Sequence, residues 1–537
     1  MSTLLRISLA AVASCALVAA RSSVFPDCSG IAHASFSAAF PATFLNVTYY
    51  DTGTLNVSGI VNEVSFCEFL VSIRYGKNVS MGAGRSNSLQ FALWLPELKY
   101  PSRLMALGNG GEAGVINYDD MMDDLNSGLN FAVAAGNAGH LFSDNDAGVG
   151  TSLGAPGVYQ PYFHDEDQVK AWLHDAISIF TPAAKSLMES YYGYRPRHSY
   201  FRSCSTGGAQ AFSLAEFHPD LFDGIIAGCP ANWFTHLSLA FLWGQQQTKT
   251  DATTLPAPVL DFIQASVIKE CDLIDGVADN LIENPLACPF NISSLACTAA
   301  HHAENITCLT PSQLSAAKAL YQGPVRSDSL STSIFPGYAL GSEGGWSLPQ
   351  VQGAMSNAIT IPILQNLVYR NLSYDPSTFN WASDVDFLDS RVGPLIDAVT
   401  TNFTSFRKSG KKMIVYAGWA DPMISPMWSM QHVEAITKAT MGSQTTIAEN
   451  DFIKLVMVPG GGHCGAQVAK YPYVPAQYGF SSAIVDWVEN KTEPVEGIKS
   501  WGPTNGENRT RRLCTWPLVA KFKAGGDVDD WESYTCG

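Results

Sequence analysis

The sequence predicts an α/β fold in which a parallel sheet is interrupted by one large insertion. Strand-like and helix-like segments alternate across residues 85–240, and the alternation returns near residue 413. Between them, residues 232–405 hold four cysteines, four N-x-Ser/Thr sequons and many Pro and Gly residues, without a clear alternation. Strands separated by helices imply parallel pairing through crossover connections.

The individual elements follow from short apolar runs and from helical spacing. Apolar runs, several rich in β-branched residues, predict strands at residues 89–95, 103–107, 130–135, 200–201, 222–229, 413–416 and 452–458. Apolar side chains at helical spacing predict helices at residues 165–192 and 209–217. The insertion is expected beside the carboxyl ends of the strands, where α/β sheets bind their ligands.

Composition and charge narrow the classes of function. The chain has 537 residues, of which 46% are hydrophobic and 15% charged, so it is expected to be globular. Its 32 Lys and Arg against 48 Asp and Glu give a formal charge of −16. Because an acidic surface repels phosphate backbones, we expect no nucleic-acid partner. No segment after the leader is long and apolar enough for a membrane span, so no membrane partner is expected.

The N-terminus has the pattern of a secretory signal peptide, expected over residues 1–20. Arg6 is a basic flank, residues 7–18 are apolar, and residues 18–20 form a small-residue cleavage site. Nine N-glycosylation sequons agree with secretion: Asn46, Asn56, Asn78, Asn291, Asn305, Asn371, Asn402, Asn490 and Asn508. The sequence therefore predicts a secreted, extracellular glycoprotein.

Eleven cysteines remain after the leader is removed, and no CxxC motif occurs. In an oxidising compartment they are expected to form disulfides and not zinc sites. The expected pairs are Cys271–Cys288, Cys297–Cys308, Cys514–Cys536, Cys204–Cys464 and, as the remaining pair, Cys28–Cys67. Cys229 lies in an apolar run and is the expected odd, buried thiol.

Two dipeptides, Cys204-Ser205 and His463-Cys464, carry the main functional signal. If the two cysteines pair, the bond brings Ser205 and His463 together, where an imidazole can activate a hydroxyl. Residues 203–207 also form a relaxed G-x-S-x-G, with Ser in place of the first glycine. This pattern is typical of a sharp strand-to-helix turn that exposes a nucleophilic serine. The competing interpretation of Ser205 is a structural turn, and that of His463 a surface loop histidine.

Asp421 completes a candidate triad. It follows the strand expected at residues 413–416, as His463 follows the strand expected at 452–458, and the order Ser, Asp, His is that of α/β-hydrolases. In this hypothesis Ser205 attacks an acyl carbonyl, His463 transfers the proton and Asp421 holds the imidazolium. The competing interpretation is a loop-capping aspartate, and the other candidates are Asp384, Asp386, Asp389 and Asp451.

The oxyanion of an acyl-transfer reaction needs two backbone N–H groups. Thr206, directly after the nucleophile, is one candidate, and Gly111 in a glycine-rich turn after an early strand is the other. A flexible glycine turn is the alternative for Gly111.

A second constellation lies in the insertion, where three carboxylates fall within eight residues: Asp272, Asp275 and Asp279. Calcium favours such oxygen-rich loops, and the carbonyl groups of Val277 and Leu281 are candidates for further ligands. The loop departs from the EF-hand pattern, and Cys271 and Cys288 bracket it. The competing interpretation is a solvated acidic turn.

Together, Cys204-Ser205, Asp421 and His463-Cys464 resemble the signature of the tannase and feruloyl esterase family of secreted serine esterases. The acidic loop at residues 275–279 resembles the family's lid calcium site, and residues 338–343 resemble another lid segment. The resemblance implies an α/β-hydrolase fold with a large inserted lid domain. The catalytic domain would span residues 21–231 and 406–537, and the lid 232–405 with a structural calcium ion.

The family resemblance implies phenolic esters on plant cell-wall sugars as substrates. Tannase members are often cut at a dibasic site in the lid, and none occurs in residues 232–405. This absence favours a feruloyl esterase, acting on feruloyl or p-coumaroyl esters, over a tannase acting on galloyl esters. A different class of function, a catalytically silent secreted binding glycoprotein, is the remaining alternative.

Overall fold

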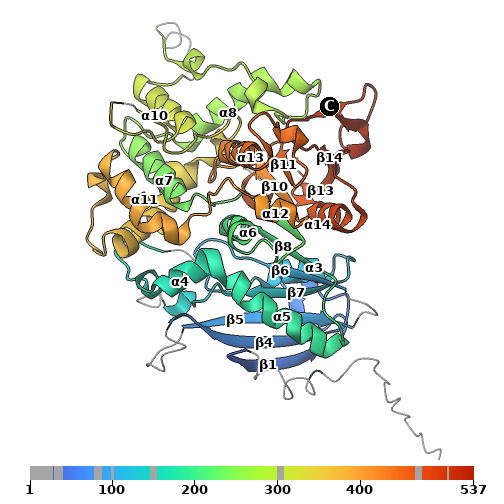
Figure 1. The fold of residues 1–537 in the computed structure, drawn as a ribbon. Coiled ribbons are helices and arrows are strands. Elements are labelled where there is room, and N and C mark those ends of the chain that lie inside the picture. Colours follow the sequence, from blue (N-terminus) through green and yellow to red (C-terminus); the bar gives the residue numbers. More distant parts are fainter. Residues whose placement is uncertain are drawn as a thin grey trace, which may run out of the picture.

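A nine-stranded sheet forms the centre of the protein (Figure 1). The computed structural model describes residues 28, 40–77, 87–97, 102–144, 154–298, 308–329, 331–465, 475–504 and 507–537. In spatial order the strands are β1 (Ala42–Tyr50), β4 (Phe66–Tyr75), β5 (Asn87–Pro96), β7 (Phe131–Gly136), β6 (Arg103–Leu107), β8 (His198–Cys204), β9 (Gly224–Gly228), β10 (Lys412–Gly418) and β11 (Ile453–Val458). The signal peptide expected at residues 1–20 lies outside the described residues.

The sheet is mixed. The six strands from β7 to β11 pair in parallel, whereas β1, β4 and β5 pair antiparallel at the other edge. Every strand expected from the sequence is present, and the α/β-hydrolase class is confirmed. The parallel strands β6, β7, β9 and β11 are buried along almost their whole length, which explains why they read as continuous apolar runs.

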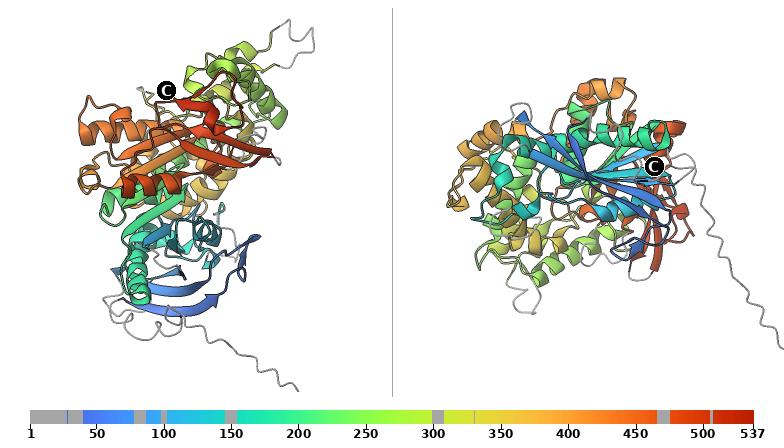
Figure 2. Two further views of the ribbon diagram at one scale, coloured as in Figure 1. Left: turned by 90° about the vertical axis from the view of Figure 1, so that its right-hand side faces the viewer. Right: turned by 90° about the horizontal axis from the view of Figure 1, so that it is seen from below.

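Helices cover both faces of the sheet (Figure 2). On one face lie α5 (Ala176–Tyr192), α6 (Thr206–Phe217) and α13 (Pro426–Met441), whose apolar side chains join the largest core cluster. On the other face lie α3 (Tyr118–Leu125) and α14 (Phe480–Val485), which pack into a second cluster. The long helical pattern expected at residues 165–192 is divided into α4 (Glu166–Lys170), a π-helical turn (Ala171–Asp175) and α5.

The insertion is mainly helical and lies in the upper part of Figure 1. Its longer helices are α7 (Phe234–Thr248), α8 (Ala257–Cys271), α10 (Pro311–Gln322) and α11 (Ser383–Ile396). Side chains between Leu255 and Trp346 form an apolar cluster of their own. By contrast, α7 and α11 pack into the main core, so the insertion is anchored to the sheet.

The C-terminal segment adds a small antiparallel sheet of β12 (Gln477–Tyr478), β13 (Ile498–Thr504) and β14 (Glu507–Leu513). A hairpin of β15 (Ala520–Phe522) and β16 (Tyr534–Cys536) follows. The five expected disulfides are all present, and Cys229 is a free, buried cysteine. None of the helices in the described part of the chain is long and apolar enough to cross a membrane.

Candidate active site

Ser205 occupies a sharp turn between β8 and α6. Its φ of 64° lies in the left-handed region, and its N–H donates to the Gly228 carbonyl oxygen at 2.9 Å. A Cβ added at Gly207 would lie 1.8 Å from the Ser203 Oγ, and one at Gly208 would lie 2.5 Å from the Gly228 oxygen. The two glycines are therefore required by the close approach of strand and helix, and the serine is presented above the sheet.

His463 and Asp421 follow neighbouring parallel strands, β11 and β10, so their loops meet at the same edge of the sheet. The His463 Nδ1 donates to the Asp421 Oδ2 at 2.8 Å. The other oxygen of Asp421 accepts from the N–H groups of Met423 at 2.8 Å and Ile424 at 3.0 Å. Asp421 is 1% exposed, so its carboxylate is fixed by three hydrogen bonds away from water.

The other aspartates considered from the sequence lie elsewhere. Their contacts are Asp384 with the Asn380 N–H, Asp386 with Arg326, Asp389 with His236, and Asp451 with Arg407. Of the five candidates, Asp421 is the one that the fold brings to His463.

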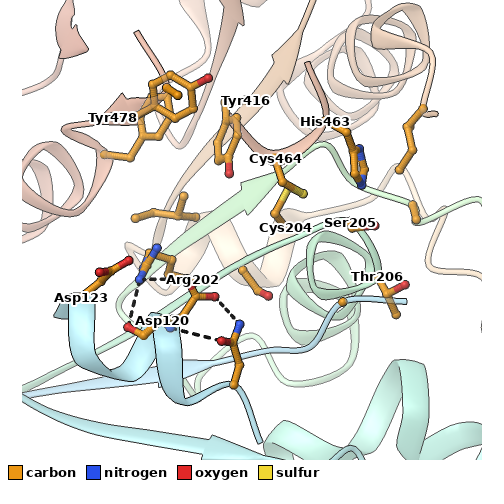
Figure 3. Close-up of a pocket in the computed structure, with 18 of the residues that line it drawn as sticks. Asp120, Asp123, Arg202, Cys204, Ser205, Thr206, Tyr416, His463, Cys464 and Tyr478 are labelled. Atoms are coloured by element: carbon orange, nitrogen blue, oxygen red, sulfur yellow. Dashed lines mark hydrogen bonds and ion pairs between the residues drawn. A yellow bond between two sulfur atoms is a disulfide. The ribbon is translucent and has the colours of Figure 1, made fainter. Parts of the chain in front are cut away.

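The Cys204–Cys464 disulfide connects the segments that carry Ser205 and His463, with 5.8 Å between the two Cα atoms. Figure 3 shows the imidazole of His463 directed toward Ser205, with the disulfide beside them. Both residues line a cavity of about 770 Å³. With Nδ1 donating to Asp421, Nε2 is the nitrogen through which a neutral His463 can take the serine proton.

The charge of Asp421 sets the electrostatics of His463. Burial lowers the pKa of the imidazole, but the attraction of Asp421 and its hydrogen bond outweigh that effect and raise this pKa above its ordinary value. The pair can therefore stabilise an imidazolium at His463, as a serine–histidine acyl-transfer mechanism requires.

The two expected oxyanion residues, Thr206 and Gly111, both line the cavity. The loop that carries Gly111 is held by side chains that the sequence analysis did not single out. The Asn109 Nδ2 donates to the carbonyl oxygens of Gly136 at 2.7 Å and Val115 at 3.0 Å. The Trp172 Nε1 donates to the Gly111 oxygen at 3.1 Å. These contacts leave the loop little freedom, as a preorganised oxyanion site requires.

Gln210 connects this loop to the serine helix. Its Oε1 accepts from the Asn109 N–H at 3.0 Å, and its Nε2 donates to the Trp172 carbonyl oxygen at 2.8 Å. Gln210 and Asn109 are 2% and 3% exposed. In the sequence, Asn109 is visible only as an Asn in a glycine-rich turn and Gln210 only as a Gln five residues after Ser205. Neither position indicates that the two residues contact each other, which the fold alone shows.

The cavity has two chemically different sides. All the described lining residues that come from the insertion are apolar: Phe234, Leu237, Phe241, Met355 and Ile359. Polar lining residues come from α3, from the segments that flank it and from β8: Asn117, Asp120, Asp123, Ser127 and Arg202. Figure 3 shows Asp120, Asp123 and Arg202 on the side of the disulfide away from Ser205. An ester bound at Ser205 can thus place one end among apolar side chains and the other among polar ones.

The acidic loop after α8 contains all the residues expected to bind calcium. One oxygen of each aspartate accepts a backbone N–H within the loop: Asp272 from Asp279, Asp275 from Val277, and Asp279 from Leu281. Within the described part of the chain, the three carboxylates are not gathered as closely as the ligand atoms around a bound ion would be.

Two arginines of β14, which the sequence analysis did not connect with this loop, contact its carboxylates. Arg511 forms ion pairs with Asp275, Asp279 and Glu283, and Arg509 pairs with Asp279. With Asp272 of the same loop and Asp529, which pairs with Arg509, five carboxylates therefore meet two guanidinium groups, and three formal negative charges remain uncompensated. The donor chemistry and this net charge fit a divalent cation.

The fold and this site define a class of protein, the carboxylic ester hydrolases of the α/β-hydrolase fold. Residues 75–537 match the family model described as "Tannase and feruloyl esterase". The chain belongs to this family and is a carboxylesterase of the feruloyl esterase and tannase type.

Curated relatives align over most of their length. Feruloyl esterase B of Aspergillus niger is 27% identical over 518 residues, which cover 93% of this chain and 92% of the relative. An uncharacterized esterase of Xanthomonas campestris pv. campestris is 28% identical over 488 residues, which cover 84% of this chain and 82% of the relative.

Solved structures share the fold. Feruloyl esterase B from Aspergillus oryzae superposes with a TM-score of 0.79 at 22% identity and covers 95% of this chain and 100% of its own. Tannin acyl hydrolase from Aspergillus niger gives a TM-score of 0.70 at 20% identity and covers 94% of each chain. At 22% and 20% identity, the two solved structures establish the fold of this chain but not its substrate.

Proposed function

We propose that Ser205, His463 and Asp421 hydrolyse a carboxylic ester through an acyl-enzyme. Ser205 Oγ attacks the carbonyl carbon while His463 Nε2 takes its proton, and the imidazolium then protonates the leaving alcohol. Water repeats the sequence and releases the acid. The hydrogen bond from His463 Nδ1 to Asp421 at 2.8 Å is the observation that carries this proposal.

The N–H groups of Thr206 and Gly111 are the proposed oxyanion donors. The first belongs to the residue after the nucleophile, and the second belongs to the loop that Asn109 and Trp172 hold in place. Both residues line the cavity at Ser205, which supports this assignment. Such donors act on the charge that develops on the carbonyl oxygen in the transition state.

We propose hydroxycinnamoyl esters of plant cell-wall sugars, with feruloyl or p-coumaroyl acyl groups, as the substrates. The apolar lining that Leu237, Phe241 and Met355 help to form supports an aromatic acyl group with few hydroxyls. A galloyl ring carries three adjacent hydroxyl groups, each of which costs free energy when buried without a partner. The name of the relative feruloyl esterase B points the same way.

A comparison of kcat/KM for methyl ferulate and methyl gallate tests this proposal. We expect methyl ferulate to be hydrolysed faster. A preference for methyl gallate supports the second candidate, a tannase, because both enzymes share the triad and differ in the acyl pocket. Hydrolysis of neither ester by folded protein favours the alternative of a silent binding glycoprotein.

We further propose a structural calcium ion at the acidic loop, with Asp272, Asp275 and Asp279 as carboxylate ligands and Val277 and Leu281 as carbonyl ligands. The uncompensated charge beside Arg509 and Arg511 supports this proposal. The ion would stabilise the packing of the insertion against the C-terminal segment and would take no part in ester chemistry.

Secretion through the signal peptide at residues 1–20, with N-glycosylation, completes the proposed function. Disulfides support an oxidising, extracellular location. Sequon side chains are exposed, as glycan attachment requires, at Asn46, Asn56, Asn291, Asn371, Asn402 and Asn490. Asn78, Asn305 and the side chain of Asn508 lie outside the described part of the chain.

A further inference from the structure

Cys229 is a buried thiol that the ester mechanism leaves unused. It follows β9 with a φ of 37°, a left-handed conformation that is costly for a non-glycine residue. Its N–H donates to the Tyr416 carbonyl oxygen at 2.7 Å, and its Sγ accepts from the Cys464 N–H at 3.5 Å. The first bond fixes the backbone of Cys229 beside β10, and the second fixes its sulfur beside the residue after His463.

The sulfur of Cys229 completes a set of three metal-ligating side chains with Asp421 and His463. One ligand atom from each lies within 4.8 Å of the other two, and among the described residues no other group of three His, Cys, Asp or Glu side chains is as close. Tetrahedral zinc, with bonds of about 2.0–2.3 Å, places neighbouring ligand atoms about 3.5 Å apart. The set therefore needs only a small contraction to enclose an ion.

The chemistry of the three ligands selects the kind of ion. Thiolate, imidazole and carboxylate together suit borderline-soft cations such as Zn²⁺ and Cd²⁺, whereas Ca²⁺ and Mg²⁺ prefer oxygen ligands alone. His463 lines the cavity and its side chain is 15% exposed, so an ion has a path to the set from the substrate side.

We propose that Cys229, Asp421 and His463 form an inhibitory site for a borderline-soft divalent cation. Cys229 loses its thiol proton to solvent and binds as the thiolate. His463 binds through Nδ1, whose proton moves to Nε2, and Asp421 binds through one oxygen. One proton is released, and the two anionic ligands neutralise the ion.

Inhibition follows from the imidazole tautomer. With a proton on Nε2, His463 has no lone pair to take the proton of Ser205, and Asp421 no longer accepts from Nδ1. The inhibitory effect rests on the proposed triad, whereas the binding of the ion does not.

Cadmium titration of the full-length protein tests this proposal, with Ca²⁺ in excess so that the acidic loop of the insertion is occupied. Cys229→Ala removes the sulfur, and Cys229→Ser is the matched variant that keeps its size and polarity. Each protein's inhibition is normalised to its own activity without cadmium. We expect the half-inhibitory Cd²⁺ concentration to rise at least about tenfold in both variants. Equal sensitivity of wild type and variants overturns the proposal.

A second measurement follows binding without activity. Cd²⁺ bound to a thiolate gives an ultraviolet charge-transfer absorption, which we expect in wild type and in inactive Ser205→Ala, at one Cd²⁺ per chain, and not in Cys229→Ala. Absence of the band from wild type overturns the proposal, even where the protein proves to be an esterase. A band that persists in Ser205→Ala supports the site independently of the mechanism.

Discussion

The disulfide between Cys204 and Cys464 joins the residue before the proposed nucleophile to the residue after the proposed base, across a sequence separation of 260 residues. Ser205 and Cys464 both have positive φ, at 64° and 56°, conformations that are costly for residues other than glycine. The bond therefore holds two strained turns in one arrangement. We infer that its main contribution is to the position of His463 relative to Ser205.

Removing the Cys204–Cys464 bond should lower the kcat of the protein that remains folded, in addition to lowering its stability. Closing a loop of this length stabilises the native state by about 5.5 kcal/mol in the chain-entropy model. A displacement of about 1 Å between reacting groups costs on the order of 10²-fold in rate. We therefore expect the Cys204→Ala, Cys464→Ala double variant to lose most of its kcat at temperatures where circular dichroism shows it folded.

The double variant Cys297→Ala, Cys308→Ala is the matched control, because its disulfide lies in the insertion. It should lose thermal stability but keep its kcat below its melting temperature. Equal losses of kcat in the two double variants would show that the Cys204–Cys464 bond acts on stability alone.

Ser205→Ala should abolish ester hydrolysis and leave the fold intact. The hydroxyl is the proposed nucleophile, and the triad acts as a unit, so we expect a loss of about 10⁴-fold or more in kcat. Hydrolysis of methyl ferulate is the measurement, and the melting temperature is the control for folding. Activity within tenfold of wild type would remove Ser205 from the mechanism.

Asp421→Asn should change the pH dependence as well as the rate. Asp421 raises the pKa of His463, and only the neutral imidazole accepts the serine proton, so kcat/KM rises with pH through this pKa. Loss of the carboxylate charge lowers the pKa, so the acidic limb should move to lower pH while the plateau falls by about 10⁴-fold. Asp451→Asn, which breaks an ion pair with Arg407, should leave the acidic limb in place.

Calcium removal should lower the melting temperature, because an ion that binds only the native state stabilises it by mass action. Asp275→Asn should weaken this effect, whereas Asp251→Asn, at an exposed carboxylate of the same insertion, should not. The measurements are elemental analysis and thermal unfolding with and without chelator. Protein without calcium, and with unchanged unfolding in chelator, would contradict the proposed ion and favour the competing interpretation of a solvated acidic turn.

The strands and the chemistry of the site were predictable because their signals are local. Buried parallel strands are short apolar runs, and the Cys-Ser and His-Cys pairs lie within single turns. The antiparallel strands β1 and β4 were not predicted. One face of β1 is exposed, so it lacks an apolar run. In β4 the apolar residues are interrupted by Glu68, Ser72 and Arg74, so this strand has no continuous apolar run either.

Contacts between distant segments were the part that the sequence did not reveal. Arg511 meets Asp275 and Asp279 only because β14 packs against the insertion. Likewise, Gln210 of α6 contacts Asn109 in the loop after β6. In both cases the residue types are common surface residues, and only the fold explains why they are buried.

Labelling with a serine-directed fluorophosphonate, followed by peptide mass spectrometry, tests the central claim most directly. The reagent reacts with a serine that a neighbouring base activates and that lies beside oxyanion donors. We expect one phosphonyl adduct per chain, on the peptide that contains Ser205, and none in Ser205→Ala or in heat-denatured protein. An unlabelled native protein, or an adduct on another serine, would contradict the account.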